Sequence, residues 1–292
     1  MKDICCIGHI TKDKIITPLQ TTDMAGGTSY YFSYALCSLP SAVSYGLVTK
    51  VGEESMPTVL AMRADGIDVV AHASRHSVFF ENKYGSNSDE RTQRVLEKAD
   101  PFTTDELSQL EARVFHLGPL LADDFAPGTV ELLAGKGKVS IDAQGFLRSL
   151  DGTAVHPTDW QDKLQTLRHT HTLKVNESEM LTITGLSEPR EAARTLAGWG
   201  VKEVVITLGS NGSLIFTDGQ FHCIPAYPPK CIVDATGCGD SYSAAYLYCR
   251  AQGETPMESG KYAAALCTLK LEQSGPFRKS EKEVLEVLKK QQ

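Results

Sequence analysis

The sequence predicts an α/β protein in which a mostly parallel central sheet carries helices on both faces and a small β appendage. After residue 104, short apolar runs alternate with segments of helical periodicity, which is typical of a parallel sheet covered on both sides. Residues 67–98 instead contain consecutive extended segments with polar alternate positions and no long helix between them. That pattern indicates a small antiparallel sheet with one solvent-exposed face.

Composition narrows the class of protein. The chain has 292 residues and a net charge of −7, which suits a single α/β domain over 1–292 and argues against a nucleic-acid partner. No apolar run is long enough to cross a bilayer. Asp3 makes the N-terminus unlike a secretory signal, and the cysteines form no C-x-x-C pair or zinc spacing, as expected of reduced core cysteines. We therefore expect a cytoplasmic protein that does not bind membranes.

The first third of the chain mixes elements of the sheet with the appendage. Strands are expected at 3–10 and 44–52, and helices at 26–39 and 56–66, the second one ended by Gly66. The remaining segments are extended and more polar. We therefore assign these segments, at about 10–20 and 67–98, to the appendage.

The rest of the chain places polar and glycine residues where apolar runs end. The runs expected to form strands cover 112–120, 137–145, 170–180, 202–212 and 231–240. Each contains Gly, Asn or Asp toward its end, with helical segments between most of them. Because ligands bind beyond the carboxyl ends of parallel strands, we expect a ligand site there.

The stretch "DATGCGD", residues 234–240, indicates the chemistry of that site. Gly237 and Gly239 allow a tight turn that exposes successive N–H groups at the positive end of a helix, where an anion such as phosphate would bind. Asp240 lies in the first turn, where the helix end favours its ionised form at neutral pH. An anion cradle beside a carboxylate base suits phosphoryl transfer to an alcohol. The alternative is a glycine-rich helix start with Asp240 stabilising the helix dipole.

Other nucleotide-binding motifs are missing from the sequence. It contains no G-x-x-x-x-G-K-[ST] loop, and no G-x-G-x-x-G follows a strand. The sequence therefore gives little support to a P-loop enzyme or to a fold that binds nicotinamide or flavin dinucleotides.

The same stretch resembles the D-x-T-G-x-G-D signature of the ribokinase/PfkB family of carbohydrate kinases. The resemblance extends in order along nearly the whole chain. Further matching segments are "CCIGHITKD", "GGTSYYFSYAL", "GLVTKVG", "KVNESEM" with its N-x-x-E, and "TLGSNGS". It implies a three-layer α/β/α sandwich, ATP as co-substrate, Mg²⁺, and a β lid over the sugar formed by the appendage.

The resemblance also implies residue roles. Asp240 would be the catalytic base, and the anion hole would consist of Gly237, Cys238 and Gly239. ATP would be bound by Asn176, Thr207, Gly209 and Gly212, with Glu179 holding Mg²⁺, often through water. Asp13, Gly26 and Gly27 would bind the acceptor, and Asp234 and Thr236 would bind a monovalent cation such as K⁺. Two structural alternatives remain: Asn176 with Glu179 is also a helix capping box, and "TLGSNGS" is also a plain hairpin turned at Asn-Gly.

Departures from the family pattern bear on the acceptor. Tyr30 and Tyr31 stand about where relatives carry a sugar-binding Asn, which argues against ribose bound in the usual way. The segment "SIDAQGFLR" resembles a subgroup that includes myo-inositol kinases, with Gln144 placed to bind a polyol. Arg148 would bind substrate or phosphate, or else be a solvated loop charge.

Together these features predict an ATP-dependent kinase of a small sugar or polyol, with inositol-like polyols or a hexose derivative ranked above ribose. The alternatives are a nucleoside kinase of the same fold, or a catalytically idle member that binds a sugar or nucleotide. The exposed β patch also suggests a homodimer formed through the lid.

Overall fold

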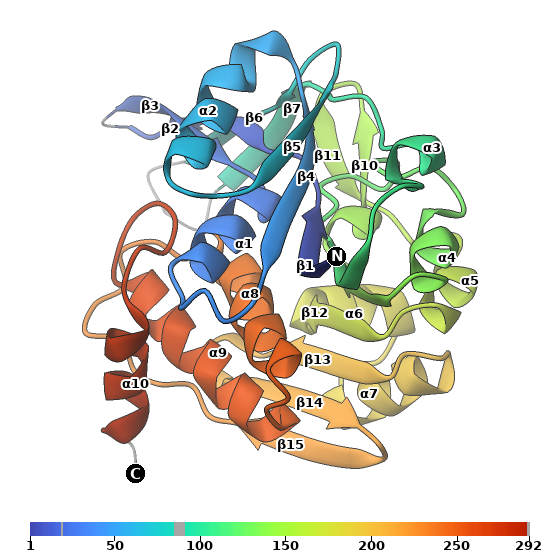
Figure 1. Cartoon of the computed structure of the whole chain (residues 1–292), viewed down its shortest axis with the longest axis vertical. Coiled ribbons are helices and arrows are strands. Elements are labelled where there is room, and N and C mark those ends of the chain that lie inside the picture. Colours follow the sequence, from blue (N-terminus) through green and yellow to red (C-terminus); the bar gives the residue numbers. More distant parts are fainter. Residues whose placement is uncertain (19, 85–90, 291–292) are drawn as a thin grey trace.

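The computed structural model describes residues 1–18, 20–84 and 91–290, and it is built around a large mixed sheet (Figure 1). In spatial order, its strands are β15 (Gln220–Ile224), β14 (Ser213–Thr217), β13 (Glu203–Thr207), β12 (Thr172–Asn176), β9 (Lys138–Asp142), β8 (Ala112–Leu117), β1 (Lys2–Ile7), β4 (Tyr45–Val51) and β5 (Val69–Ala73). The strands from β13 to β5 pair in parallel, and β14 and β15 are antiparallel additions at one edge. The predicted mostly parallel central sheet is confirmed.

Helices cover both faces of this sheet and make a three-layer sandwich (Figure 1). One face carries α1 (Thr28–Cys37), α2 (Met56–Ala64), α8 (Cys238–Ala251), α9 (Pro256–Leu271) and α10 (Glu281–Lys289). The other carries α3 (Thr104–Leu107), α4 (Thr129–Ala134), α5 (Lys163–Arg168), α6 (Glu177–Thr184) and α7 (Pro189–Gly198). A separate hydrophobic core lies on each face. Strands such as β4, which lie between the two cores, are therefore buried along their whole length.

A smaller sheet forms the lid, in the order β10 (Arg148–Asp151), β11 (Ala154–Pro157), β7 (Arg91–Glu97), β6 (Val78–Tyr84), β2 (Thr11–Ile16) and β3 (Thr21–Gly26). The predicted lid bounds, 10–20 and 67–98, therefore need correction. β5 belongs to the central sheet, because it follows α2 and pairs in parallel with β4. The lid in turn gains β3, β10 and β11, and its β2–β6 pair is parallel where antiparallel pairing was expected. Residue 19 and residues 85–90 of the predicted segments lie outside the described residues.

The apolar stretch before the anion-binding turn is not the strand that its sequence suggested. Residues 225–236, which include the first part of the strand expected at 231–240, form no regular element. The prolines at positions 225, 228 and 229, in the segment that leads into it, cannot donate to a sheet ladder. The N–H of Val233 instead donates to the carbonyl of Leu271 at 2.8 Å. Cys231 in this stretch and Cys37 at the end of α1 are exposed, so the expectation of core cysteines fails for both.

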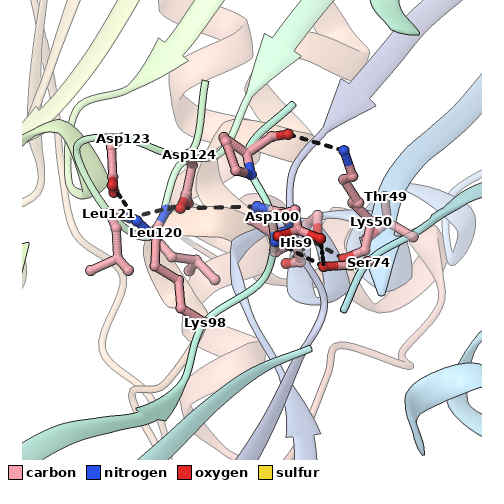
Figure 2. A network of polar contacts seen from close by, with 12 residues as sticks. His9, Thr49, Lys50, Ser74, Lys98, Asp100, Leu120, Leu121, Asp123 and Asp124 are labelled. Carbon is pink, nitrogen blue, oxygen red and sulfur yellow. Dashed lines mark hydrogen bonds and ion pairs between the residues drawn. The ribbon is translucent and has the colours of Figure 1, made fainter. Parts of the chain in front are cut away.

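A buried polar network fixes the chain where the central sheet passes into the lid (Figure 2). His9, between β1 and β2, stacks on Phe102, and its Nε2 lies 3.9 Å from Oδ1 of the Asp124 carboxylate. Asp124 also accepts hydrogen bonds from the N–H groups of Leu120 and Leu121, at 2.7 and 3.1 Å. Both leucines pack into the small hydrophobic core beneath the lid. The network thus ties the base of the lid to the end of the central sheet.

Candidate active site

Asp240 stands at the start of α8, as predicted. The helix is preceded by Gly237, whose φ of 75° favours glycine, and the N–H of Ser241 donates to the Gly237 carbonyl at 2.9 Å. The N–H of Cys238 donates to Ala235 at 3.2 Å, so this predicted anion-hole donor is engaged in a turn in this structure. The N–H groups of Gly239 and Asp240 belong to the first helical turn, which has no preceding intrahelical acceptors. This end of α8 therefore has the polarity of an anion site.

The electrostatics of Asp240 differ from the sequence expectation. The pKa of Asp240 is raised to about 8, chiefly by burial and also by the negative charges of Asp142 and Glu179, although the positive charges of Lys174 and Arg148 act in the opposite direction. An acid at a helix N-terminus was expected to be ionised at neutral pH. The surrounding carboxylates and the limited access of water outweigh that effect here.

Two charged residues that the sequence analysis did not select lie at this site. The Nζ of Lys174 on β12 is 3.1 Å from Oδ2 of Asp142 at the end of β9, and both side chains are almost completely buried. Although burial disfavours its charge, the carboxylates of Asp142, Glu179 and Asp240 raise the pKa of Lys174. A Cβ on Gly239 would lie 2.9 Å from this Nζ, so the ammonium packs directly against the anion-binding turn. The signal in the sequence was a lysine inside an otherwise apolar strand, two residues before Asn176.

Asn176 and Glu179 form the capping box that was considered as their structural role. The side chain of Asn176 accepts from the Glu179 N–H at 2.9 Å, and Glu179 accepts from the Asn176 N–H at 2.8 Å. Glu179 also lies close enough to Lys174 and Asp240 to affect their pKa values. Among the described residues, no cluster of three or more His, Cys, Asp or Glu side chains is arranged to hold a metal ion. The carboxylates at this site fit Mg²⁺ only together with donor phosphates and water, which is the usual way that this ion is bound.

The predicted nucleotide residues lie beside this cluster. Thr207 ends β13 and pairs directly with Asn176 in the sheet register. The next turn connects β13 and β14 as a hairpin, with φ values of 55° at Gly209 and 87° at Gly212. A Cβ on Gly212 would lie 2.0 Å from the carbonyl oxygen of Ile224, so only glycine fits there.

The predicted acceptor residues gather under the lid. Asp13 on β2 is 8% exposed and accepts a hydrogen bond from the hydroxyl of Thr11 at 2.7 Å. A Cβ on Gly26 would lie 2.4 Å from Oδ2 of Asp13, and one on Gly27 would lie 2.7 Å from the carbonyl of His9. The two glycines therefore let the backbone approach the carboxylate closely.

An amide pair that the sequence analysis did not identify lies on the same inner face of the lid. Asn82 on β6 is buried and accepts a hydrogen bond from Gln93 on β7 at 2.9 Å. Asn82 lies two residues beyond Phe80, which pairs with Asp13, so both polar side chains face inward. Asn82 belongs to none of the motifs in the sequence, so its role could not be predicted from the residues around it.

Tyr31 connects the acceptor side of the site with the anion-binding turn. Its ring is 2% exposed and packs so closely on Gly237 that a Cβ there would lie 2.3 Å from Cδ1 of the ring. Its hydroxyl is buried without a hydrogen-bond partner among the described residues. Burial raises the pKa of Tyr31, as do the charges of Asp13, Asp234 and Asp240. Carboxylates from both halves of the site therefore influence the Tyr31 hydroxyl.

Of the remaining predicted residues, Arg148 belongs to the charged cluster, while Gln144 and Asp234 take part in local backbone hydrogen bonds. Arg148 begins the lid strand β10 and lowers the pKa values of Asp240 and Glu179, so it belongs to the charged cluster. Gln144 precedes a short 3-10 turn, and its N–H donates to Oδ1 of Asp142 at 3.2 Å. Asp234 accepts from the N–H of Thr236 at 2.8 Å, which shapes the turn before α8.

Within the parts of the chain that the structure describes, no helix is long and apolar enough to cross a membrane.

Comparisons with known proteins show the family of this chain. Residues 87–283 match the model of the pfkB family carbohydrate kinases. A cytidine kinase of Thermococcus kodakarensis is 30% identical over 268 residues, which cover 88% of this chain and 91% of the relative.

Solved structures of kinases from the ribokinase family are similar to this chain over nearly its whole length. A pyrophosphate-dependent kinase of the ribokinase family, complexed with a pyrophosphate analogue and myo-inositol, superimposes with a TM-score of 0.86 at 27% identity, covering 97% of this chain and 99% of that one. A ribokinase of Arabidopsis thaliana complexed with ribose and ATP, 18% identical, shares the fold with a TM-score of 0.79 over 99% of both chains. The chain therefore belongs to the pfkB family of carbohydrate kinases, phosphotransferases whose acceptor is a hydroxyl group.

Proposed function

We propose that this enzyme transfers the γ-phosphoryl group of ATP to a hydroxyl of a small polyol or sugar, with Asp240 as the general base. The observation that carries the proposal is the position of Asp240 in the first turn of α8, beside the Lys174 ammonium that packs on Gly239. A base for the acceptor hydroxyl and positive charge for the transferred group thus lie together. Phosphoryl transfer depends on this combination of positioning and electrostatic stabilisation.

The steps follow from the placement of these groups. Asp13 and the backbone near Gly26 and Gly27 orient the acceptor beneath the lid. The Asp240 carboxylate takes the proton of the reacting hydroxyl, whose oxygen forms the new bond to phosphorus while the bond to ADP breaks. The N–H groups of Gly239 and Asp240 and the side chains of Lys174 and Arg148 stabilise negative charge on the transferred group. Mg²⁺, which Asn176 and Glu179 would help to hold together with water and the donor phosphates, would neutralise the charge of those phosphates.

Magnesium dependence can be tested separately from catalysis. Glu179→Gln keeps an acceptor for the N–H of Asn176 but removes a charge, so it should raise the Mg²⁺ concentration for half-maximal rate. Full activity in excess chelator would refute the metal requirement.

Exposed apolar side chains favour ATP over pyrophosphate as the donor. Ile232 and Val233 are 74% and 56% exposed, in the stretch that leads into the anion-binding turn. A flat nucleobase can cover such side chains, whereas pyrophosphate has no apolar part. Pyrophosphate is the second candidate, because the similar structure with myo-inositol belongs to a pyrophosphate-dependent kinase.

The inner face of the lid favours a polyhydroxylated acceptor. Asp13, Asn82 and Gln93 offer carboxylate and amide groups that can bind several hydroxyls at once. The myo-inositol bound by a similar kinase supports an inositol-like polyol. The cytidine kinase relative makes a nucleoside, cytidine before others, the second candidate.

One experiment decides both donor and acceptor. ATP and pyrophosphate are each paired with myo-inositol, fructose, ribose, cytidine and adenosine, and the new phosphomonoester is followed by ³¹P NMR, which reads both donors equally. We expect ATP with myo-inositol, or with fructose as a hexose, to give the fastest turnover. A wide margin for ribose or for a nucleoside would overturn the acceptor, and a wide margin for pyrophosphate would overturn the donor. Asp13→Ala should abolish acceptor use while leaving ATP binding intact.

The lid also supports a homodimer. β3 forms one edge of the lid sheet, and its first three residues are exposed, so its backbone is available for pairing with a second copy. Light scattering coupled to size exclusion would give twice the monomer mass. A monomer at micromolar concentration would refute this association.

A further inference from the structure

A completely buried lysine lies in the last turn of the long helix α9, beside the anion-binding turn. The side chain of Lys270 is 0% exposed, and its Nζ donates to the carbonyls of Asp234 at 3.2 Å and Gln273 at 3.4 Å. Oδ2 of Asp234 lies 3.7 Å from the same Nζ, and the ring of Tyr31 lies 5.9 Å away. A buried ammonium needs such oxygen partners, because it has left water entirely.

These contacts bear on the monovalent cation that the family resemblance implied at Asp234 and Thr236. Both carboxylate oxygens of Asp234 are already engaged, Oδ1 by the N–H of Thr236 at 2.8 Å and Oδ2 by the Lys270 ammonium. The carbonyls of Asp234 and of Gln273, which lies just beyond the end of α9, also accept hydrogen bonds from Lys270. A second positive charge among these oxygens would be repelled at close range. The residues present therefore do not fit a K⁺ ion at this place.

We propose that the Lys270 ammonium is a built-in substitute for the monovalent cation, so that the enzyme works without K⁺. The ammonium binds the turn at 234–236 to the end of α9, where the N–H of Val233 also donates to Leu271 at 2.8 Å. That turn leads directly into Gly237 and the first residues of α8. Lys270 is thus a positioning residue: it holds the backbone of the anion-binding turn and does not touch the transferred group.

The wild-type enzyme provides the first test. Initial rates with the best donor and acceptor pair are measured in potassium, sodium and tetramethylammonium chloride at equal ionic strength. We expect rates that agree within about twofold. A K⁺-specific increase of more than fivefold, saturating at millimolar concentrations, would overturn the proposal.

Thermal melting of the protein without substrates gives a second readout that does not depend on catalysis or on the proposed function. The wild type should melt at the same temperature in potassium and tetramethylammonium chloride. Lys270→Met should melt lower in tetramethylammonium and regain stability specifically in K⁺ or NH₄⁺, because its oxygen cluster has lost its cation. A K⁺-specific stabilisation of the wild type, or a folded Lys270→Met that gains none, would refute the assignment.

Kinetics of the same variants complete the test. Lys270→Met should lose at least tenfold in rate in tetramethylammonium chloride and recover part of it in K⁺ or methylammonium chloride. Lys230→Met is the matched control, since this exposed lysine lies in the stretch before the same turn, and it should show no cation dependence. If Lys270→Met does not fold, the rates and melting of the wild type still decide the question.

Discussion

The Nζ of Lys174 lies 3.1 Å from Oδ2 of Asp142, and this buried ion pair stands directly behind the anion-binding turn. The pair places one positive charge among the carboxylates of Asp142, Glu179 and Asp240, and the neighbouring charges of the cluster shift the pKa values of both Lys174 and Asp240. The charge on Asp240 is therefore a property of the cluster and not of its helix alone. The predictions below concern this coupling.

Asp240→Asn should lower kcat by about 100-fold or more, the scale of a lost general base, while the fold and ATP binding are retained. Single-turnover rates and isothermal titration with ATP would measure the two effects separately. Asp162→Asn, a change of the same chemistry just before α5, is the control and should leave kcat unchanged. Near-normal turnover of folded Asp240→Asn would remove this residue from the mechanism.

The pH dependence of the free enzyme should report Asp240. Because the base must be ionised and its pKa is raised to about 8, kcat/KM for the acceptor should rise with pH, with its midpoint near pH 8. The stability of the fold should change with pH in the opposite direction. A raised pKa in the folded state means that stability is lost as pH rises from the unfolded value toward 8. Asp240→Asn should thus melt higher than the wild type at pH 8.5 and lose that advantage toward pH 4.

The two partners of the buried pair should shift this pH profile in opposite directions. Lys174→Met removes a charge that lowers the pKa of Asp240, so the profile should move to higher pH. Asp142→Asn removes a charge that raises it, so the profile should move to lower pH.

Lys174→Met should also cost about 3–5 kcal/mol of unfolding free energy, since it leaves a carboxylate buried and unpaired. Lys163→Met breaks a more exposed ion pair with Asp159 and should cost about 1 kcal/mol or less. Denaturant unfolding measures both values. Shifts of the pH profile in the same direction for the two partners would contradict the proposed coupling.

The hydroxyl of Tyr31 should matter to the acceptor and not to the fold. Because it has no hydrogen-bond partner among the described residues, Tyr31→Phe should leave the melting temperature unchanged or raise it. We expect KM for the acceptor to rise about 3–10-fold, the value of one lost hydrogen bond, with KM for ATP unchanged. In the control Tyr34→Phe, loss of the 2.8 Å bond to Asp65 should lower stability without affecting KM. Unchanged acceptor KM in Tyr31→Phe would exclude this role.

The sequence was sufficient for the elements whose signals are local. Periodicity and turn residues located β1, β4, β8, β9, β12 and β13, and the glycine pattern placed Gly237 and Asp240 at the start of α8. It failed where partners are distant in the chain. No local signal distinguishes β5, which continues the central sheet, from the lid strands that follow it.

The charged cluster around Asp240 could not be predicted from the sequence, because its members are also distant in the chain. Lys174 and Asp142 come together only because β9 and β12 are neighbours, although they are not consecutive strands. The raised pKa of Asp240 depends on that neighbourhood and on burial, neither of which can be read from the residues around it.

The assembly of the lid from separate parts of the chain has a consequence for folding kinetics. β2 pairs with β6, and β11 pairs with β7, so the lid closes long loops that the central strands must first bring together. We therefore expect the lid to form after the folding transition state. Truncation of Val95 in the small core beneath it should accelerate unfolding and leave the refolding rate nearly unchanged. Amide hydrogens of β6 and β7 should exchange through local opening long before those of β1 and β8. The part of the molecule that covers the acceptor is then also the part that can open without unfolding the rest.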